Sequence, residues 1–419
     1  MKLRHRWSAA TMGCGLVLIV AGCAMDQGWR QAMERGHTAV RAGEYSKAEE
    51  QFTVARNEAK KIDPKGRRMA ESLSQLGEVN RDMGNFAKAE SLFQEALSIR
   101  ESVFGPNHAE TASSLTDLGE LYRVQGLYAQ AEAMHQRARE IREKIYGPED
   151  AKTAESLNNI AVVYQDQGRY ADAEPILQRA LGILERTVGP SHSLSAITRD
   201  NLAQLYQAQG QHARAMPLYQ RALVIHEKAF GPDHPIVGRN LINLGETYQV
   251  QNQYQQAEVL YQRAVYIFKR SLGSDHVDTA NAISHLAQLY ELQGLYSQAE
   301  PLYQQSLAIR EKRLGAEHPQ LAMELNNLAI LYQSQNRLDQ SEELYRRALG
   351  IFEKAAGQER KAYAKALKSY ASLLRRKQRG AEAERLEERA KSVLKRLSLE
   401  TQHRGSTAGD LVPSVTPTP

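Results

Sequence analysis

The sequence predicts an all-helical protein in which about nine helix–turn–helix units stack into a superhelical solenoid over residues 29–396. Two observations predict it: a 42-residue period without insertions, and helical hydrophobic periodicity inside each period. Equal intervals indicate that each period is one structural unit. Seven glycines mark the period, namely Gly105, Gly147, Gly189, Gly231, Gly273, Gly315 and Gly357.

Within one period the pattern predicts a first helix, a turn and a second helix. From Leu157 to Tyr164, apolar residues occupy positions i, i+3, i+4 and i+7, which lie on one helical face. Gly168 then interrupts the pattern, and a second apolar face follows over 173–184. Gly189 and the proline after it end that second helix. In two other repeats, Ser297 and Asp339 are the expected N-caps of the second helix.

Small and aromatic residues at fixed positions explain how the units stack. Alanine recurs with the same step from Ala131 to Ala299, and tyrosine recurs from Tyr122 to Tyr332. Alanine lets neighbouring helices approach closely, and we interpret the tyrosines as core packing. One hairpin cannot bury its apolar side alone, so each unit is expected to depend on its neighbours.

The repeated blocks resemble the tetratricopeptide repeat, and their length resembles the longer repeats of kinesin light chains. The resemblance rests on segments such as 157–192 and 325–351, which begin LNNIAVVYQDQ and LNNLAILYQSQ, and it covers residues 29–396. It implies a right-handed superhelix whose concave side is lined by the first helix of each pair. The first repeat is one residue out of register and the last lacks the Gly-Pro-x-His segment, as expected of terminal units.

The concave face is the predicted site of partner binding. Its outward columns carry amides and short polar groups, which donate and accept hydrogen bonds and therefore suit a peptide backbone. The alternative is that this face is only a solvated helix surface. The residues assigned to partner binding on this ground are Asn158, Asp200, Asn326, Gln165, Gln207, Gln249 and Gln333.

The resemblance to kinesin light chains implies further binding residues. Those proteins hold cargo peptides with the Asn of their LNNLA segments, which Asn158 and Asn326 match, and with the Arg of a second-helix segment, ALxIREK. Other repeats of this chain replace that arginine, so a basic cluster is expected only toward the ends of the array. The arginines that match are Arg100, Arg142 and Arg310.

The N-terminus resembles a bacterial lipoprotein signal. A basic segment, MKLRHRW, precedes an apolar run that is shorter than the roughly 20 residues needed to span a bilayer. The run ends in Ala21-Gly22-Cys23. The resemblance implies loss of residues 1–22, acylation of Cys23, a linker over 23–28, and anchoring in the outer membrane facing the periplasm. A secretory signal with a chance cysteine is the alternative.

Composition disfavours several other kinds of site. Cys14 and Cys23 are the only cysteines, so no disulfide framework or thiol chemistry is expected beyond them. We interpret the net charge of +5 as a small, dispersed surplus, which does not favour nucleic acid. Histidines recur at one position in five units, a whole number of units apart, which indicates helix capping rather than a metal site; they are His108, His192, His234, His276 and His318. No catalytic constellation, cofactor or small-molecule substrate is predicted.

These features together predict a non-enzymatic, lipid-anchored scaffold of the bacterial cell envelope that binds proteins or peptides. The alternative is a structural subunit or assembly factor of an envelope complex (pilus, secretion or outer-membrane assembly) that acts through self-association. The sequence leaves the oligomeric state open. Residues 397–419 are polar, non-periodic and rich in Pro and Thr, so a disordered tail is expected there.

Overall fold

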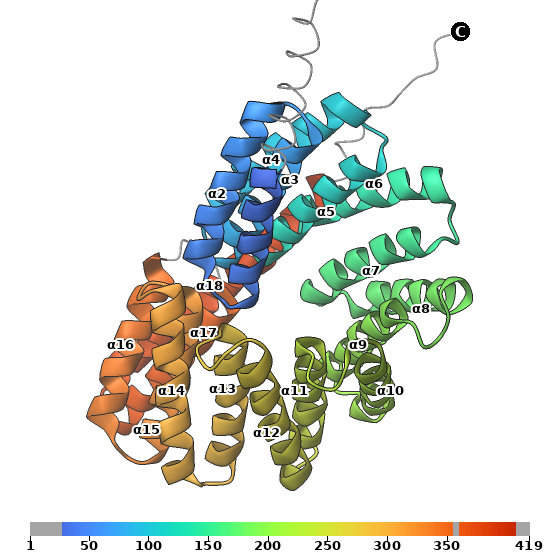
Figure 1. Cartoon of the computed structure of the whole chain (residues 1–419). Coiled ribbons are helices and arrows are strands. Elements are labelled where there is room, and N and C mark those ends of the chain that lie inside the picture. The colour runs from blue at the N-terminus through green and yellow to red at the C-terminus, as the bar shows by residue number, and fades with distance from the viewer. Residues whose placement is uncertain (1–26, 355–359, 408–419) are drawn as a thin grey trace, which may run out of the picture. The chain divides into compact units, whose positions relative to one another are not determined.

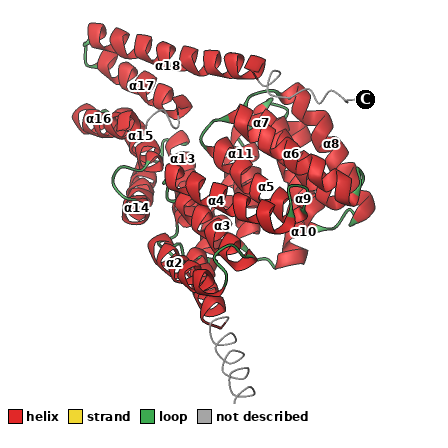
Figure 2. Ribbon diagram, turned by 90° about the horizontal axis from the view of Figure 1, so that it is seen from above, coloured by secondary structure: helices red, strands yellow, loops and turns green. Residues whose placement is uncertain are grey.

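The structure is a computed structural model that describes residues 27–354 and 360–407, with side chains as far as residue 396. Every regular element in these ranges is a helix, and the helices form nine consecutive pairs (Figures 1 and 2). The predicted number and type of units is therefore confirmed. After a first helix over residues 27–41, the elements are α2 (Tyr45–Ile62), α3 (Arg67–Asp82), α4 (Phe86–Phe104), α5 (Ala109–Val124), α6 (Tyr128–Tyr146), α7 (Ala151–Asp166), α8 (Tyr170–Thr187), α9 (Ser193–Ala208), α10 (His212–Phe230), α11 (Pro235–Val250), α12 (Tyr254–Ser271), α13 (Val277–Leu292), α14 (Tyr296–Leu314), α15 (Pro319–Ser334), α16 (Leu338–Lys354), α17 (Arg360–Arg376) and α18 (Gly380–Thr407).

The chain divides into two compact units, one ending at Leu118 and one beginning at Gly119, so that the boundary lies within α5. In the first unit, a core cluster runs from Ala32 in the first helix to Ile99 in α4. In the second unit, one cluster extends from Val237 in α11 to Tyr332 in α15. Such continuity across several helix pairs is what stacked repeats require, because each pair covers the apolar side of the next.

The glycine that closes each pair has the backbone conformation that the sequence predicts. At six of the seven marker positions φ lies between +89° and +100°, a region that favours glycine, and the seventh, Gly357, lies outside the described residues. The turn inside each pair also needs positive φ. Three repeats place another residue at that turn, namely Asn252, Asn336 and Gln378, with φ of 58°, 62° and 60°.

Close helix contact within a pair depends on a small residue facing a large one. Tyr261 in α12 has no exposed surface, and a Cβ placed on Gly245 of α11 would lie 2.6 Å from its ring. The predicted alanine column, from Ala131 to Ala299, is fully buried. The predicted tyrosine column is also confirmed as packing, since Tyr164 and Tyr206 are less than 10% exposed. In addition, their hydroxyls bond to Glu132 and Glu174 of the preceding second helix, at 2.7 and 3.0 Å.

Two expectations about helix ends are wrong. Leu295 rather than Ser297 is the N-cap of α14, and α16 begins at Leu338, so Ser297 and Asp339 lie inside the first turn. The helix α18 continues to Thr407, so residues 397–407 are helical rather than a disordered tail. The glycine of positive φ that ends the second helices from α4 to α14 is absent there, and no Gly or Pro interrupts the helix between Gly380 and Gly405. Residues 408–419 lie outside the described residues.

No helix in the described ranges has the length and apolarity needed to cross a membrane.

Candidate partner-binding face

The predicted glutamine column lies on the first helices of four repeats in the second unit. Gln165 is on α7, Gln207 on α9, Gln249 on α11 and Gln333 on α15, and each side chain is partly exposed. Adjacent first helices touch one another along this column. Gln207 Nε2 donates to Glu246 of α11 at 3.1 Å, and Gln333 Nε2 donates to a serine of α17 at 3.3 Å. The structure therefore brings these amides into one continuous face.

Buried tyrosines of the second helices hold three of these amides. The hydroxyls of Tyr219, Tyr261 and Tyr345 each donate to the Oε1 of the glutamine twelve residues earlier. The donor–acceptor distances are 3.0 Å to Gln207, 3.0 Å to Gln249 and 3.1 Å to Gln333. Burial raises the pKa of all three tyrosines, so their hydroxyls remain protonated donors. Sequence analysis missed this set, although its 42-residue spacing is visible.

Among the five repeats from α7 to α16, two depart from the tyrosine–glutamine pattern. In α13 the column holds Glu291, whose Oε2 accepts from Tyr303 at 2.8 Å and whose pKa is raised by burial. In the pair α7–α8 the tyrosine is replaced by Leu177, which has no hydroxyl. Gln165 Oε1 is accordingly buried without a hydrogen-bond partner in the described part of the chain. Gln165 is thus the amide of the column with a free acceptor.

The predicted asparagines and Asp200 are less accessible than a contact surface requires. Asn158 and Asn326 are 8% and 5% exposed. Asn158 accepts a hydrogen bond from Asn201 at 2.9 Å, across adjacent first helices. Asp200 bonds to His226 and accepts from an asparagine of α11, and burial raises its pKa. Their contact with a partner stays a prediction, which burial restricts to the few exposed atoms.

The arginines that match the kinesin light chain pattern lie between repeats. Arg100, Arg142 and Arg310 are 7%, 9% and 7% exposed. Arg100 donates to Ser114 at 2.6 Å and Arg142 donates to Ser156 at 2.7 Å, each on the next first helix. Arg310 lies 3.6 Å from the carboxylate of the buried Glu324. These guanidinium groups therefore join successive repeats, and direct binding of a partner by them stays a prediction.

The histidine column caps helices, as predicted. Nδ1 of His108, His192, His234, His276 and His318 accepts the backbone N–H two residues later, at 3.0–3.3 Å. In the remaining position of the column, Asp150 accepts from Lys152 N at 2.8 Å. A neutral imidazole is required for this bond because the protonated ring has no acceptor. No group of three or more His, Cys, Asp or Glu in the described ranges is arranged to hold a metal.

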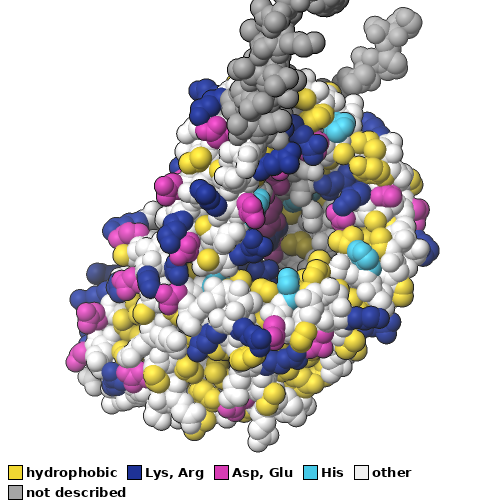
Figure 3. Space-filling model, in the orientation of Figure 1, with side chains coloured by type: hydrophobic (Ala, Val, Ile, Leu, Met, Phe, Trp, Pro, Cys, Tyr) yellow, Lys and Arg dark blue, Asp and Glu magenta, His cyan; other side chains and the backbone are white. Residues whose placement is uncertain are grey.

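The charge surplus is not dispersed, contrary to the sequence interpretation. Residues 360–396 contain thirteen Lys and Arg against four Glu, and α17 has no acidic residue. Lys365 and Lys368 are exposed on one face of α17. Elsewhere, on the face that Figure 3 shows, basic and acidic side chains are interspersed. A count by segment would have found this cluster, which a total for the whole chain conceals.

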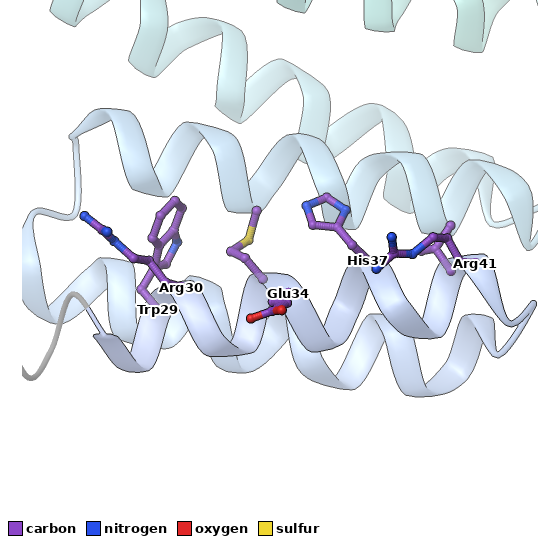
Figure 4. A pocket seen from close by; sticks show the side chains of 7 residues that line it. Trp29, Arg30, Glu34, His37 and Arg41 are labelled. Atoms are coloured by element: carbon purple, nitrogen blue, oxygen red, sulfur yellow. The ribbon is translucent and has the colours of Figure 1, made fainter. Parts of the chain in front are cut away.

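The first unit carries a separate hollow of about 620 Å³ along one face of its first helix (Figure 4). Trp29, Met33, His37 and Val40 line it together with Arg30, Glu34 and Arg41. The Trp29 indole donates to Ser72 at 2.9 Å, which fixes the ring against α3. The spacing of Trp29, Met33, His37 and Val40 is helical and could have shown this face from the sequence.

A second feature of the first unit is an acidic pair on α3 and α5. Burial, followed by the nearby charge of Asp117, raises the pKa of Glu78 to about 7.

The other predicted site residue, Cys23, lies outside the described residues.

Comparison with protein families gives one match that spans most of the array. A tetratricopeptide repeat model matches seven overlapping segments that together cover residues 68–396. The chain belongs to the tetratricopeptide repeat family. A comparison with curated protein sequences gives no significant match.

Among solved structures similar to the chain, one has the higher sequence identity and two have the higher TM-scores. Repeats of a putative kinesin light chain from Podosopora anserina are 28% identical, cover 50% of this chain and 99% of that chain, and superpose with a TM-score of 0.42. A Rap protein complexed with competence and sporulation factor is 15% identical, covers 89% of this chain and 99% of that chain, and has a TM-score of 0.59. The Rap conjugation gene regulator of plasmid pLS20, solved with the Phr* peptide, is 15% identical, covers 78% of this chain and 96% of that chain, and has a TM-score of 0.54.

Proposed function

We propose that this tetratricopeptide repeat protein is a non-enzymatic scaffold that binds extended segments of partner proteins on the face formed by its first helices. The observation that carries the proposal is the column of amides on α7, α9, α11 and α15, three of which are held by buried tyrosines. Amides fixed in this way present hydrogen-bonding groups without reorganisation, which lowers the entropy cost of binding. The Rap regulator solved in complex with the Phr* peptide supports the proposal, because it is a protein of similar fold that binds a peptide.

Binding through this face is tested by changing two of its amides. Peptides selected from a random twelve-residue phage library against the purified full-length chain are labelled, and their affinity is measured by fluorescence anisotropy. Gln207→Ala combined with Gln249→Ala is expected to weaken binding about thirtyfold, since each removes a hydrogen bond of roughly 1 kcal/mol. The matched control changes Gln220 and Gln262, exposed glutamines on the second helices of the same repeats. Equal loss in both double variants would contradict the proposed face.

We also propose that the scaffold is anchored to the outer membrane of a bacterium, facing the periplasm, by acyl chains on Cys23. The support is the order of basic segment, apolar run and small residues before this cysteine. Labelling of growing cells with radioactive palmitate is expected to mark the chain, and Cys23→Ala is expected to abolish the label. Cys14→Ala is the matched control and should retain it. A labelled Cys23→Ala chain would refute anchoring at this residue.

A further inference from the structure

Buried tyrosines lie beneath the amide column in every repeat from α9 to α16, whereas Leu177 takes that position beneath Gln165. Both facts help to define which ligand the face binds. Tyr219, Tyr261 and Tyr345 have no exposed surface, so their hydroxyls reach the face from inside the pair. Each hydroxyl occupies the Oε1 of its glutamine. The Oε1 of each of these glutamines accepts from a tyrosine inside the helix pair. The Nε2 of the same amide then points toward the solvent side of the face, because oxygen and nitrogen are attached to the same planar carbon.

The side-chain Nε2 atoms of these glutamines have N–H donors available for a partner. Each glutamine Nε2 carries two hydrogens, and Gln207 and Gln333 use one of them toward the neighbouring first helix. The second hydrogen of each remains for a partner. Glu291 interrupts the series, because a carboxylate accepts and does not donate. The column on α9, α11 and α15 is therefore a row of hydrogen-bond donors.

The spacing of these donors favours one backbone conformation. Packed helices lie about 8–10 Å apart, so equivalent positions on adjacent first helices are separated by about that distance. A polyproline II segment advances about 9 Å in three residues, and its threefold symmetry returns every third carbonyl to the same side. A β-strand turns successive residues to alternate faces and does not repeat at three. Gln207 and Gln249, on adjacent first helices, therefore match carbonyl oxygens three residues apart in a polyproline II segment, and Gln333, two first helices beyond Gln249, matches the carbonyl six residues further on.

We propose that Tyr219, Tyr261 and Tyr345 are positioning residues that turn Gln207, Gln249 and Gln333 into donors for the carbonyl oxygens of a partner segment in the polyproline II conformation. The inference rests on the proposed function and names the chemistry of its partner. Gln165 marks the end of the row, because Leu177 has no hydroxyl and the Oε1 of Gln165 has no donor in the described part of the chain. A segment rich in proline fits the row, because proline has a carbonyl acceptor and no N–H that needs a partner.

The probe is a fluorescein-labelled decaproline peptide, titrated with the purified full-length chain and followed by anisotropy. A (Gly-Ser)₅ peptide of equal length is the comparison, because it contains the same number of carbonyls without the preformed conformation. Decaproline is expected to bind at least tenfold more tightly. Equal affinity for the two peptides would overturn the assignment of conformation.

Two variants separate positioning from folding. Tyr219→Phe combined with Tyr261→Phe keeps both rings in the core and removes only the hydroxyls, and is expected to weaken decaproline binding about tenfold. Gln249→Glu keeps an acceptor for Tyr261 and removes the donor, and is expected to weaken binding as well. The matched control is Tyr290→Phe, whose hydroxyl bonds to Glu258 of a second helix at 2.7 Å. It should leave the affinity unchanged.

A readout on the amide itself checks the positioning role. In the chain labelled with ¹⁵N-glutamine, the side-chain resonance of Gln249 is expected to shift when decaproline is added. In the unliganded chain, Tyr261→Phe should also move this resonance and Tyr290→Phe should not. An unmoved Gln249 resonance in either experiment, or unaltered affinity in the double tyrosine variant, would overturn the inference.

The outcomes distinguish this inference from the proposed function. If the library peptides bind and depend on Gln207 and Gln249, but decaproline binding is absent or independent of the tyrosines, only the inference fails. If no library peptide depends on these glutamines and decaproline does not bind, the face itself is refuted.

Discussion

Burial lowers the pKa of the cap histidines His234, His276 and His318, so these caps make stability depend on pH, and His318 at the start of α15 is the clearest case. Its Nδ1 accepts the N–H of Gln320 at 3.2 Å. Burial, followed by the nearby charge of Arg310, lowers the pKa of His318 to about 4 from 6.5. Because the folded pKa lies below the unfolded one, the contribution to stability is complete above pH 6.5 and is lost as the pH falls toward 4.

The size of the loss follows from the two pKa values. Between pH 7.5 and pH 5, a histidine that titrates at 6.5 when unfolded and at about 4 when folded loses about 2 kcal/mol of stability. His318→Asn supplies a side chain that caps helices equally well and does not titrate. We therefore expect the variant to be more stable than the parent at pH 5 by about 2 kcal/mol.

Urea unfolding, followed by circular dichroism at pH 7.5, 6.0 and 5.0, measures this difference. The data at pH 7.5 are the internal control, since asparagine and neutral histidine both accept the cap hydrogen bond, and the two chains should then agree within about 0.5 kcal/mol. Only the difference between variant and parent is interpreted, because the buried His135, with its pKa lowered to about 4, titrates in both chains. Parallel stability curves across the three pH values would refute the reasoning.

Three further predictions concern single positions. Gln378→Gly should raise stability by about 1 kcal/mol in thermal unfolding, because glutamine at a φ of 60° is strained; no gain would contradict that strain. Arg310→Ala should destabilise the chain by about 3–5 kcal/mol, because it leaves the 2% exposed Glu324 without its cation. Combination with Glu324→Gln should recover part of this loss, and a double variant as unstable as the single one would argue against the pair. Glu78 has its pKa raised to about 7, so its burial costs stability increasingly as the pH rises from 4.5 through 7; Glu78→Gln should remove this pH dependence, and an unchanged slope in urea unfolding would contradict it.

The repeat architecture could be predicted because its signals are local. The glycines at the ends of the pairs need positive φ, and the histidines before the first helices accept hydrogen bonds within two residues. Both requirements act on neighbouring backbone and appear directly in the sequence. The end of α18 was predicted less well, because polar composition was taken as a sign of disorder where no residue before Gly405 stops the helix.

The candidate face was predicted only in part, because exposure on a helix depends on what packs against it. Asn158 and Gln165 are two turns apart on α7 and belong to different predicted columns. Asn158 is covered by the neighbouring first helix through Asn201, whereas Gln165 remains partly exposed. Hydrophobic periodicity places both residues on the same side of α7. It does not predict which of them the side chains of neighbouring helices cover.

The sequence by itself determined the number of units, the kind of each element, and the glycines and histidines that end second helices and cap first helices. Those properties depend on backbone conformation and on hydrogen bonds between residues close in the chain. Only the tertiary structure decided which polar groups are available. Arg142 joins two repeats, and Gln249 is held by Tyr261 twelve residues later. Such contacts are set by the distance and orientation of packed helices, which are properties of the stack rather than of any single repeat.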